Sequence, residues 1–163
     1  MSAPTQVLFV CLGNICRSPA AEGVFLACLE SAGVENRFAV DSAGTGGWHV
    51  GKPADPRMRA AARRRGLELT SRARQLQAED LLRFDHILTM DADNLAAVEA
   101  MAHRLETAGR KPRARIEPLV RYCQRHQAHE VPDPYYGGDR GFEEVLDLLE
   151  DACGGLLEAL QRP

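Results

Sequence analysis

The sequence predicts an α/β fold in which helices cover a parallel sheet. Short apolar runs with strand character alternate along the chain with longer segments whose apolar residues recur every three or four positions. The 163 residues contain no repeat, low-complexity tract or linker-like stretch, so we expect a single domain over residues 1–163. Strands that alternate with helices favour right-handed crossovers, and in such folds ligands bind at the carboxyl ends of the strands.

The chain begins with a strand, a loop and a helix. We expect the strand at about Gln6–Val10 and the helix at Pro19–Ala32, because Gly33 supplies a stop signal. Ser18 is a good N-cap residue, and Pro19 suits the first helical position. The carboxyl end of the first strand is therefore expected close to a helix N-terminus.

The rest of the chain continues this alternation. The last helix has the clearest pattern, because its apolar residues form one continuous stripe. Its Gly154–Gly155 pair indicates a kink or a close packing contact. The expected elements are a strand at Phe38–Ser42, a helix at Asp55–Arg65, a short helix at Ala78–Arg83, a strand at His86–Met90, a helix at Ala92–Ala102, a strand at Ala114–Pro118 and a helix at Phe142–Leu160.

Composition argues against several classes of function. A formal net charge of −3 gives no sign of a nucleic-acid binder, and the arginine-rich stretch 57–65 is expected to be a solvated helix face. No apolar run approaches the ~20 residues of a membrane span. The N-terminus shows no signal-like leader, and the five cysteines are odd in number and unevenly spaced. We therefore expect a cytoplasmic protein with reduced thiols that contacts neither nucleic acid nor membrane.

The loop after the first strand contains the candidate site. A nucleophilic sulfur, Cys11, and a guanidinium, Arg17, bracket a turn whose backbone N–H groups can converge on one anion. Helix N-termini and neighbouring cations favour the thiolate form of a cysteine, and a guanidinium fork matches a phosphoryl group. Gly13 permits a tight turn, Asn14 tolerates a left-handed conformation, and Ser18 can donate to the sulfur as it leaves. This pattern indicates phosphoryl transfer to sulfur.

Different interpretations of the cysteines are weaker. Cys11 and Cys16 could form half of a zinc site, but no second cysteine pair follows at a suitable spacing. Cys123, His126 and His129 lack an evident fourth ligand. The loop could also be a passive anion or nucleotide site, yet it lacks the glycine and lysine patterns of nucleotide loops. We expect no metal and no cofactor.

The segment Val10–Ser18, with the sequence VCLGNICRS, resembles the signature of the low-molecular-weight protein tyrosine phosphatases. Asp133–Tyr136, with the sequence DPYY, resembles the general-acid motif of that family, and the resemblance extends from about Val7 to Leu160. It implies a three-layer Rossmann-like domain with a four-stranded parallel sheet and about five flanking helices. It also implies hydrolysis of phosphotyrosine through a phosphocysteine intermediate, without a metal.

The resemblance identifies Asp133 as the general acid. One carboxyl group can protonate the leaving phenolate and then activate the water that attacks phosphocysteine. Prolines on both sides of Asp133 stiffen its backbone. Asp133 therefore joins Cys11 and Arg17 as the expected catalytic residues. The resemblance makes at least one of Tyr135 and Tyr136 a wall of the substrate cleft.

The resemblance also implies roles for residues around the cysteine. Leu12 and Ile15 are expected to line the pocket, and an isoleucine here favours phosphotyrosine over phosphoarginine. Trp48 is either a buried loop anchor or a grip on the aryl ring. Cys16 is either a small buried thiol or the partner that traps oxidised Cys11 as a disulfide. The expected phosphate-binding and loop-support residues are Leu12, Gly13, Asn14, Ile15, Cys16, Ser18 and Ser42.

One departure from the family concerns the support network. Asn14 and Ser42 resemble members of a hydrogen-bond network that usually includes a histidine, and here Ser71 occupies that position. This departure bears on the rigidity of the loop rather than on the chemistry.

Three rival functions are compatible with the same loop. An arsenate reductase needs further cysteines after the third strand, and Leu81–Leu95 contains none. The second rival is a phosphoarginine phosphatase, and the third is a non-catalytic phosphate-binding module. For a phosphatase we expect tyrosine-phosphorylated proteins as partners, together with a cognate tyrosine kinase, and a monomeric state.

Overall fold

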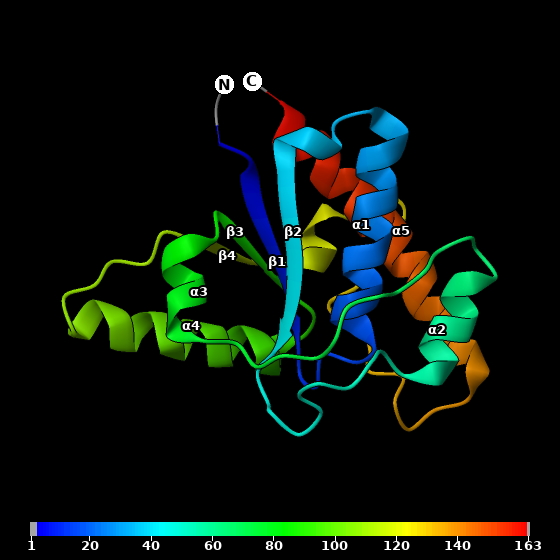
Figure 1. Cartoon of the computed structure of the whole chain (residues 1–163), viewed down its shortest axis with the longest axis horizontal. Helices are drawn as coiled ribbons and strands as arrows, with labels where there is room; N and C mark the ends of the chain where they lie inside the picture. The colour runs from blue at the N-terminus through cyan, green and yellow to red at the C-terminus, as the bar shows by residue number, and fades with distance from the viewer. Residues whose placement is uncertain (1–2, 163) are drawn as a thin grey trace.

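Four parallel strands form the central sheet, in the spatial order β2-β1-β3-β4 (Figure 1). The computed structural model describes residues 3–162, so residues 1, 2 and 163 of the predicted domain lie outside the described residues. The sheet confirms the predicted four-stranded parallel arrangement. Its strands are β1 (Thr5–Cys11), β2 (Phe38–Gly44), β3 (His86–Thr89) and β4 (Arg115–Pro118).

Helices cover both faces of this sheet and complete three layers. Helices α1, α2 and α5 lie on one side, and α3 and α4 lie on the other (Figure 1). None of the helices within residues 3–162 combines the length and apolarity needed to span a bilayer. The helices are α1 (Arg17–Ala32), α2 (Pro56–Arg63), α3 (Ala78–Arg83), α4 (Ala92–Thr107) and α5 (Asp139–Gln161), with short 3-10 helices η1 (Glu35–Arg37) and η2 (Leu119–Tyr122).

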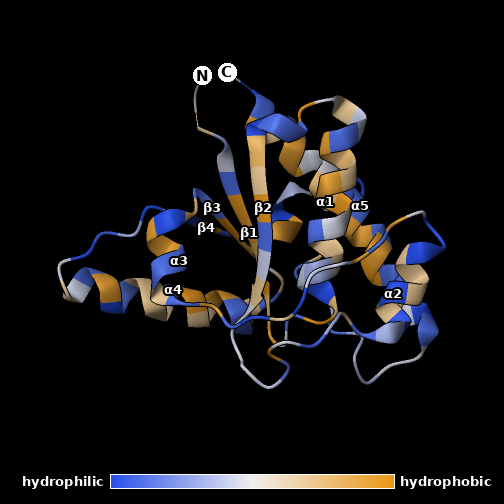
Figure 2. Ribbon diagram, in the orientation of Figure 1, coloured by the Kyte–Doolittle hydropathy of each residue, from blue (hydrophilic) through white to orange (hydrophobic). Residues whose placement is uncertain are grey.

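Strand β1 is buried on both of its faces, which explains its continuous apolar sequence. Val7, Phe9 and Cys11 belong to the apolar cluster formed with α1 and α5. Leu8 and Val10 belong to the second cluster, formed with α3 and α4. Figure 2 shows apolar residues along the central strands and on the sides of the helices that face them. Both halves of the core therefore fix the position of β1.

The candidate loop follows β1 at the topological switch point of the sheet. The chain passes from β1 to β2 on one side and later returns to β3 on the other side. Cys11 is the last residue of β1 and pairs with Gly44, the last residue of β2. Ligands of open α/β sheets bind outside such a point. The fold thus brings Cys11 to a position suited to a ligand.

The start of α1 differs from the prediction. The helix begins at Arg17, its N-cap is Cys16, and this cap makes no side-chain hydrogen bond. The predicted cap residue, Ser18, is buried inside the first turn, where its hydroxyl meets Cys11 and Asn14 instead. Pro19 takes the third helical position, where an N–H has no intrahelical partner to lose. The prediction of Ser18 as a cap was wrong.

The boundaries of several elements shift by a few residues. Helix α4 continues beyond the predicted end at Ala102, and Gly109 follows it with φ of 79°. In α5, the predicted close packing is confirmed at Gly155, where an added Cβ would overlap with the carbonyl oxygen of Tyr122. An added Cβ on Gly154 would meet no atom within 4 Å.

Candidate active site

The β1–α1 loop, residues 11–17, is fastened through its backbone. The N–H groups of Thr45 and Gly46 donate to the carbonyl oxygens of Cys11 and Leu12, each at 2.9 Å. Asn14 has φ of 57°, the left-handed conformation expected for it. This turn brings the N–H of Asn14 to 3.3 Å from the Cys11 sulfur.

Gly13 is required for a different reason than predicted. The left-handed turn falls on Asn14, whereas Gly13 is not among the residues with positive φ. An added Cβ at Gly13 would come within 2.9 Å of the His49 ring. Gly13 therefore provides room for the close approach of His49.

The Cys11 sulfur is buried and surrounded by hydrogen-bond donors. The Ser18 hydroxyl lies 3.0 Å from the sulfur. Asn14 Oδ1 accepts from the Arg74 backbone N–H at 3.0 Å, which turns Asn14 Nδ2 toward the Ser18 oxygen at 2.7 Å. The Ser18 hydroxyl can donate either to the carbonyl oxygen of Ala43, at 3.4 Å, or to the nearer sulfur when that sulfur is a thiolate. Ser18 can thus stabilise a thiolate.

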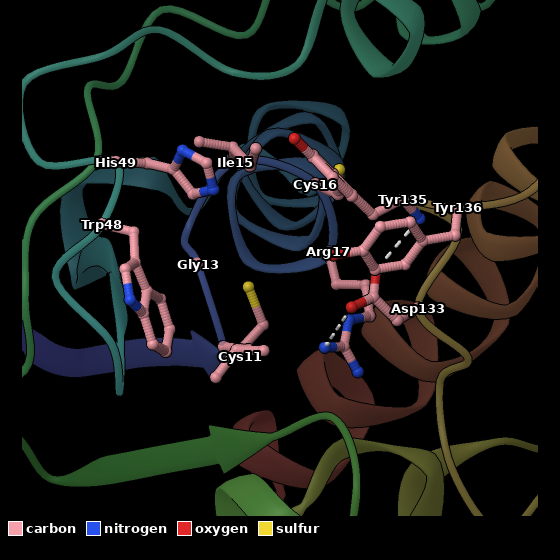
Figure 3. A pocket seen from close by; sticks show the side chains of 11 residues that line it. Cys11, Gly13, Ile15, Cys16, Arg17, Trp48, His49, Asp133, Tyr135 and Tyr136 are labelled. Atoms are coloured by element: carbon pink, nitrogen blue, oxygen red, sulfur yellow. Dashed lines mark hydrogen bonds and ion pairs between the residues drawn. The ribbon is translucent and has the colours of Figure 1, made fainter.

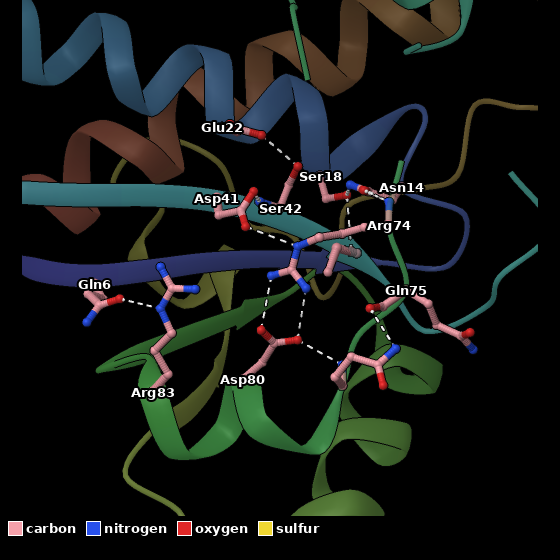
Figure 4. A network of polar contacts seen from close by, with 12 residues as sticks. Gln6, Asn14, Ser18, Glu22, Asp41, Ser42, Arg74, Gln75, Asp80 and Arg83 are labelled. Atoms are coloured by element: carbon pink, nitrogen blue, oxygen red, sulfur yellow. Dashed lines mark hydrogen bonds and ion pairs between the residues drawn. The ribbon is translucent and has the colours of Figure 1, made fainter. Parts of the chain in front are cut away.

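Two hydrogen-bonded groups support this loop from behind (Figure 4). Arg74 binds Asp80 through both terminal nitrogens and Asp41 through Nε. Ser42, expected beside Asn14, instead donates to Glu22 at 2.6 Å. Burial raises the pKa of Glu22, and hydrogen bonds from the hydroxyls of Ser42 and Ser71 oppose this effect.

Ser71 occupies the position expected for a support histidine, and it lies near enough to Glu22 to oppose the rise in the Glu22 pKa. The support for Asn14 comes from the Arg74 backbone.

Arg17 is almost completely buried and points toward the cavity. Its Nη1 donates to Asp91 at 2.6 Å and to the carbonyl oxygen of Val131 at 3.1 Å, and its Nη2 lies 3.5 Å from Asp133. Asp91 also caps α4 by accepting from the Asn94 N–H. Burial alone would lower the pKa of Arg17, but attraction to Cys11, Asp91 and Asp133 raises it. Arg17 therefore remains a cation in the site.

These side chains surround a cavity of about 390 Å³. Trp48 and His49 lie on one side of the Cys11 sulfur, and Tyr135, Tyr136 and Asp133 lie on the other (Figure 3). The predicted site residues that line the cavity are Cys11, Leu12, Gly13, Ile15, Cys16, Arg17, Trp48, Asp133, Tyr135 and Tyr136.

The exposure of the lining residues decides between the two interpretations of Trp48. Its side chain is 70% exposed at the rim, so Trp48 is not a buried loop anchor. Leu12 is also exposed, whereas Ile15 is buried in the wall. Tyr136, at 94% exposed, projects from the opposite rim.

The opposite wall is the distal loop, which we define as residues 131–138. Asp133 Oδ1 accepts from the Tyr135 N–H at 3.0 Å, which turns the carboxyl group back toward Arg17. Arg57 of α2 donates to the carbonyl oxygens of Tyr135 and Gly137. The prediction of a solvated face is confirmed for Arg63 and Arg64, whose side chains are exposed, and was wrong for Arg57 and Arg65, because Arg57 binds the distal loop and Arg65 binds Glu143 of α5.

Four residues of the site escaped sequence analysis: His49, Asp55, Arg57 and Asp91. The only local signal was the Asp55–Pro56 pair, a typical helix start, and Asp55 does cap α2. Asp91 precedes a helix in the same way, but its contact with Arg17 spans 74 residues. Neither pattern predicts a contact with the β1–α1 loop.

The remaining cysteines are free thiols. Burial, with Asp55 and Cys11 nearby, raises the pKa of Cys16 far above its usual range. A Cys11–Cys16 disulfide stays a prediction. His126 Nδ1 lies 2.8 Å from Asp151, and within residues 3–162 no group of three or more suitable side chains could hold a metal ion.

Comparison with known proteins gives consistent matches. The profile described as "Low molecular weight phosphotyrosine protein phosphatase" matches residues 6–163. A protein of Synechocystis sp., described as a putative low molecular weight protein-tyrosine-phosphatase, is 47% identical over 155 residues, covering 95% of this chain and 96% of the relative.

Two solved structures share the fold. The protein tyrosine phosphatase of Entamoeba histolytica, crystallised with Hepes in the active site, superposes with a TM-score of 0.89 at 40% identity, covering 96% of this chain and 97% of that one. A Drosophila arginine phosphatase superposes equally well, with a TM-score of 0.89, at 32% identity, covering 96% of this chain and 98% of that one.

Proposed function

This chain belongs to the low molecular weight phosphotyrosine protein phosphatase family, and we propose that Cys11, Arg17 and Asp133 carry out its hydrolysis of phosphotyrosine. One observation carries the assignment of residues. A sulfur at the end of β1, a guanidinium at the start of α1 and a carboxyl group on the distal loop line the same cavity.

In the first step, the Cys11 thiolate attacks phosphorus in line with the aryl oxygen. The S–P bond forms as the P–O bond to the tyrosine breaks. Arg17 and the N–H groups of the β1–α1 loop hold the three equatorial oxygens, where charge develops. Protonated Asp133 gives its proton to the departing phenolate, so neutral tyrosine leaves.

In the second step, the Asp133 carboxylate accepts a proton from water as the water oxygen attacks phosphorus. The S–P bond breaks, its electron pair returns to Cys11, and inorganic phosphate is released. The Ser18 hydroxyl, 3.0 Å from the sulfur, stabilises the thiolate as it leaves. The enzyme returns to its starting protonation state without a cofactor.

The cavity walls support an aryl substrate. Trp48, Tyr135 and Tyr136 surround the entrance, and aromatic rings stack well against a phosphotyrosine ring. The similarity to an arginine phosphatase gives phosphoarginine as the second candidate. Ile15 in the wall favours phosphotyrosine, because the sequence resemblance associates threonine at this position with the phosphoarginine branch.

We also infer the substrates, the oligomeric state and the cellular compartment of the enzyme. Substrates are tyrosine-phosphorylated proteins, supplied by a cognate tyrosine kinase. The enzyme acts as a single-domain monomer in the cytoplasm, where reducing conditions keep Cys11 available for attack.

Replacing the nucleophile and the acid separately tests the mechanism. Cys11→Ser should abolish turnover of p-nitrophenyl phosphate while inorganic phosphate still binds, as measured by calorimetric titration. Asp133→Ala should lower kcat/KM on a phosphotyrosine peptide by about 10²–10³-fold, the usual contribution of a general acid. Cys28→Ser, on α1 outside the cavity, is the matched control and should keep full activity. Activity close to normal in either site variant would disprove its assigned role.

A substrate panel distinguishes the candidate functions. We expect turnover of phosphotyrosine peptides to exceed that of matched phosphoarginine and phosphoserine peptides. Higher activity on phosphoarginine would reverse the substrate assignment. Arsenate reduction coupled to thioredoxin, without phosphatase activity, would favour the arsenate reductase instead.

A further inference from the structure

A single arginine of α2 connects the two loops that form the cavity. Arg57 binds the Asp55 carboxylate, with Nε 3.2 Å from Oδ1 and Nη2 3.0 Å from Oδ2. The backbone N–H of Asp55 in turn donates to the carbonyl oxygen of Ile15 at 2.8 Å. The Asp55–Arg57 pair is therefore fastened to the β1–α1 loop.

The same guanidinium also holds the distal loop. Its Nη2 donates to the carbonyl oxygen of Tyr135 at 2.8 Å, and its Nη1 lies 3.4 Å from that of Gly137. It stacks on the ring of Phe142, with Cζ 4.7 Å from the centroid. Among residues 3–162, no other side chain outside the distal loop donates to the backbone of residues 132–138.

We propose that Arg57 is a positioning residue that sets the distance of the Asp133 carboxyl group from the phosphoryl site. The Asp133 side chain is 39% exposed, and its polar contacts are with Arg17 and the Tyr135 N–H. Arg57 therefore acts on Asp133 through the backbone of Tyr135, because it binds the carbonyl oxygen of Tyr135 while the N–H of Tyr135 binds Asp133. The proposal rests on the role of Asp133 in the proposed function.

This role predicts a dependence on the leaving group. A poor leaving group such as phenolate needs the proton from Asp133, whereas p-nitrophenolate leaves well without it. Misplacing Asp133 should therefore slow phenyl phosphate more than p-nitrophenyl phosphate. Phosphate binding by the β1–α1 loop should stay unchanged, because Asp91 and Val131 hold Arg17, and the contact of Asp55 with this loop is made by the Asp55 backbone.

The experiment compares Arg57→Met with the parent enzyme on both substrates. We expect kcat/KM to fall about tenfold more on phenyl phosphate than on p-nitrophenyl phosphate, while the inhibition constant of inorganic phosphate changes less than about twofold. Arg57→Lys, which keeps the positive charge and one donor nitrogen, should recover part of the difference, and it replaces Arg57→Met if that variant does not fold. Arg64→Met is the matched control, because Arg64 pairs with Glu143 of α5 and not with the distal loop.

A second background separates this proposal from the proposed function. In Asp133→Ala, adding Arg57→Met should produce no further leaving-group dependence. Equal losses on both substrates, no loss, or an undiminished extra loss in the Asp133→Ala background would overturn the role of Arg57. If Asp133→Ala itself shows no leaving-group dependence, the acid assignment fails and takes the Arg57 proposal with it. If only Arg57→Met lacks that dependence, the Arg57 proposal alone is wrong.

Discussion

The β1–α1 loop and the distal loop form one cavity but are held in place very differently. Cys11, Asn14 and Arg17 are each 2% exposed, and backbone and side-chain bonds fasten the loop along its length. In the distal loop, Tyr136 is almost fully exposed to solvent, and the backbone of residues 132–138 is held from outside by Arg57. The β1–α1 loop is thus built into the core, and we call it the built-in loop. The distal loop is attached to the core by a few contacts, and we call it the attached loop.

This difference matches the tasks of the two loops in the proposed mechanism. Donors that stabilise developing charge act best when they are already oriented, because no reorganisation is needed during the reaction. The loop that delivers a proton to the leaving group also has to let the product out. An exposed loop with few side-chain contacts costs less free energy to open than a loop buried in the core. If this contrast is real, substitutions in the β1–α1 loop should cost more activity and stability than substitutions in the distal loop.

The largest effect is expected from Arg17→Lys, in the built-in loop. A lysine cannot reproduce the planar fork that faces Asp91, Val131 and the phosphoryl oxygens. Lysine keeps the positive charge but loses a donor aimed at the developing charge, so kcat/KM on p-nitrophenyl phosphate should fall by at least about 10²-fold. Arg113→Lys, an exposed arginine paired with Asp85, should leave activity unchanged. A loss below tenfold for Arg17→Lys would mean that the preformed guanidinium geometry is dispensable.

Asn14→Ala should weaken the built-in loop by two separable mechanisms. Alanine at φ of 57° is strained by about 1–2 kcal/mol, and losing the bonds to Ser18 and Arg74 costs about 1 kcal/mol more. Urea unfolding should therefore show a decrease of about 2–3 kcal/mol in the free energy of unfolding. Asn14→Gly is the matched variant, because glycine accepts this φ but lacks the side chain. Equal losses in both variants would show that backbone strain has no part in the effect.

The sequence predicted the built-in loop better than the attached one, for a physical reason. The features that identify the β1–α1 loop in the sequence are local, namely an apolar strand, a turn with Asn14 and a helix that follows directly, although distant residues such as Arg74 and Asp91 also hold it. The main error there concerned Ser18, because the pattern of a helix cap cannot reveal that a buried sulfur competes for the hydroxyl. A second error concerns α4, which was predicted too short because Gly109 was not taken as the glycine that ends the helix in the left-handed region.

The attached loop depends on contacts between distant parts of the chain. Arg57 lies 78 residues from Tyr135 and 80 residues from Gly137 along the chain. No periodicity or spacing encodes such pairs in a single sequence. Asp133 was predicted only through the resemblance of its motif, which is why its neighbours on α2 were missed. The fold class was easier, because alternating apolar runs determine the layers.

Asp55→Asn should reduce stability in a pH-dependent way at the junction of the two loops. Burial alone would raise the pKa of Asp55, but the hydrogen bonds from Arg57 lower it. The unfolded chain therefore binds more protons as the pH falls through the ordinary value of 3.8, and the stabilisation by the ion pair is lost as the pH falls further through the lowered pKa of the folded state. Asparagine still caps α2 through its amide oxygen, so the substitution removes the charge and one of the two oxygens that accept from Arg57.

At pH 7 we expect Asp55→Asn to lower the free energy of unfolding by about 1 kcal/mol, a modest value because Arg57 is partly exposed. Urea unfolding at pH 7, 5 and 3 should show that this difference persists at pH 5 and is smaller at pH 3. If the difference in the free energy of unfolding between Asp55→Asn and the parent protein stayed constant from pH 7 to pH 3, the Asp55 charge would not stabilise the contact between the two loops.

The smallest effect on stability is expected from Tyr136→Ala, at the outer end of the attached loop. Its ring contacts Tyr135 edge-on, with centroids 4.9 Å apart, and is otherwise in solvent, so the free energy of unfolding should change by less than about 0.5 kcal/mol. The KM for a phosphotyrosine peptide should rise about threefold if this ring stacks on the substrate. Tyr135→Ala should have larger effects, because that ring also packs near His49 and Arg57. If Tyr136→Ala destabilised the protein by more than about 1 kcal/mol, the distal loop would be part of the folded core, and its contrast with the β1–α1 loop would not hold.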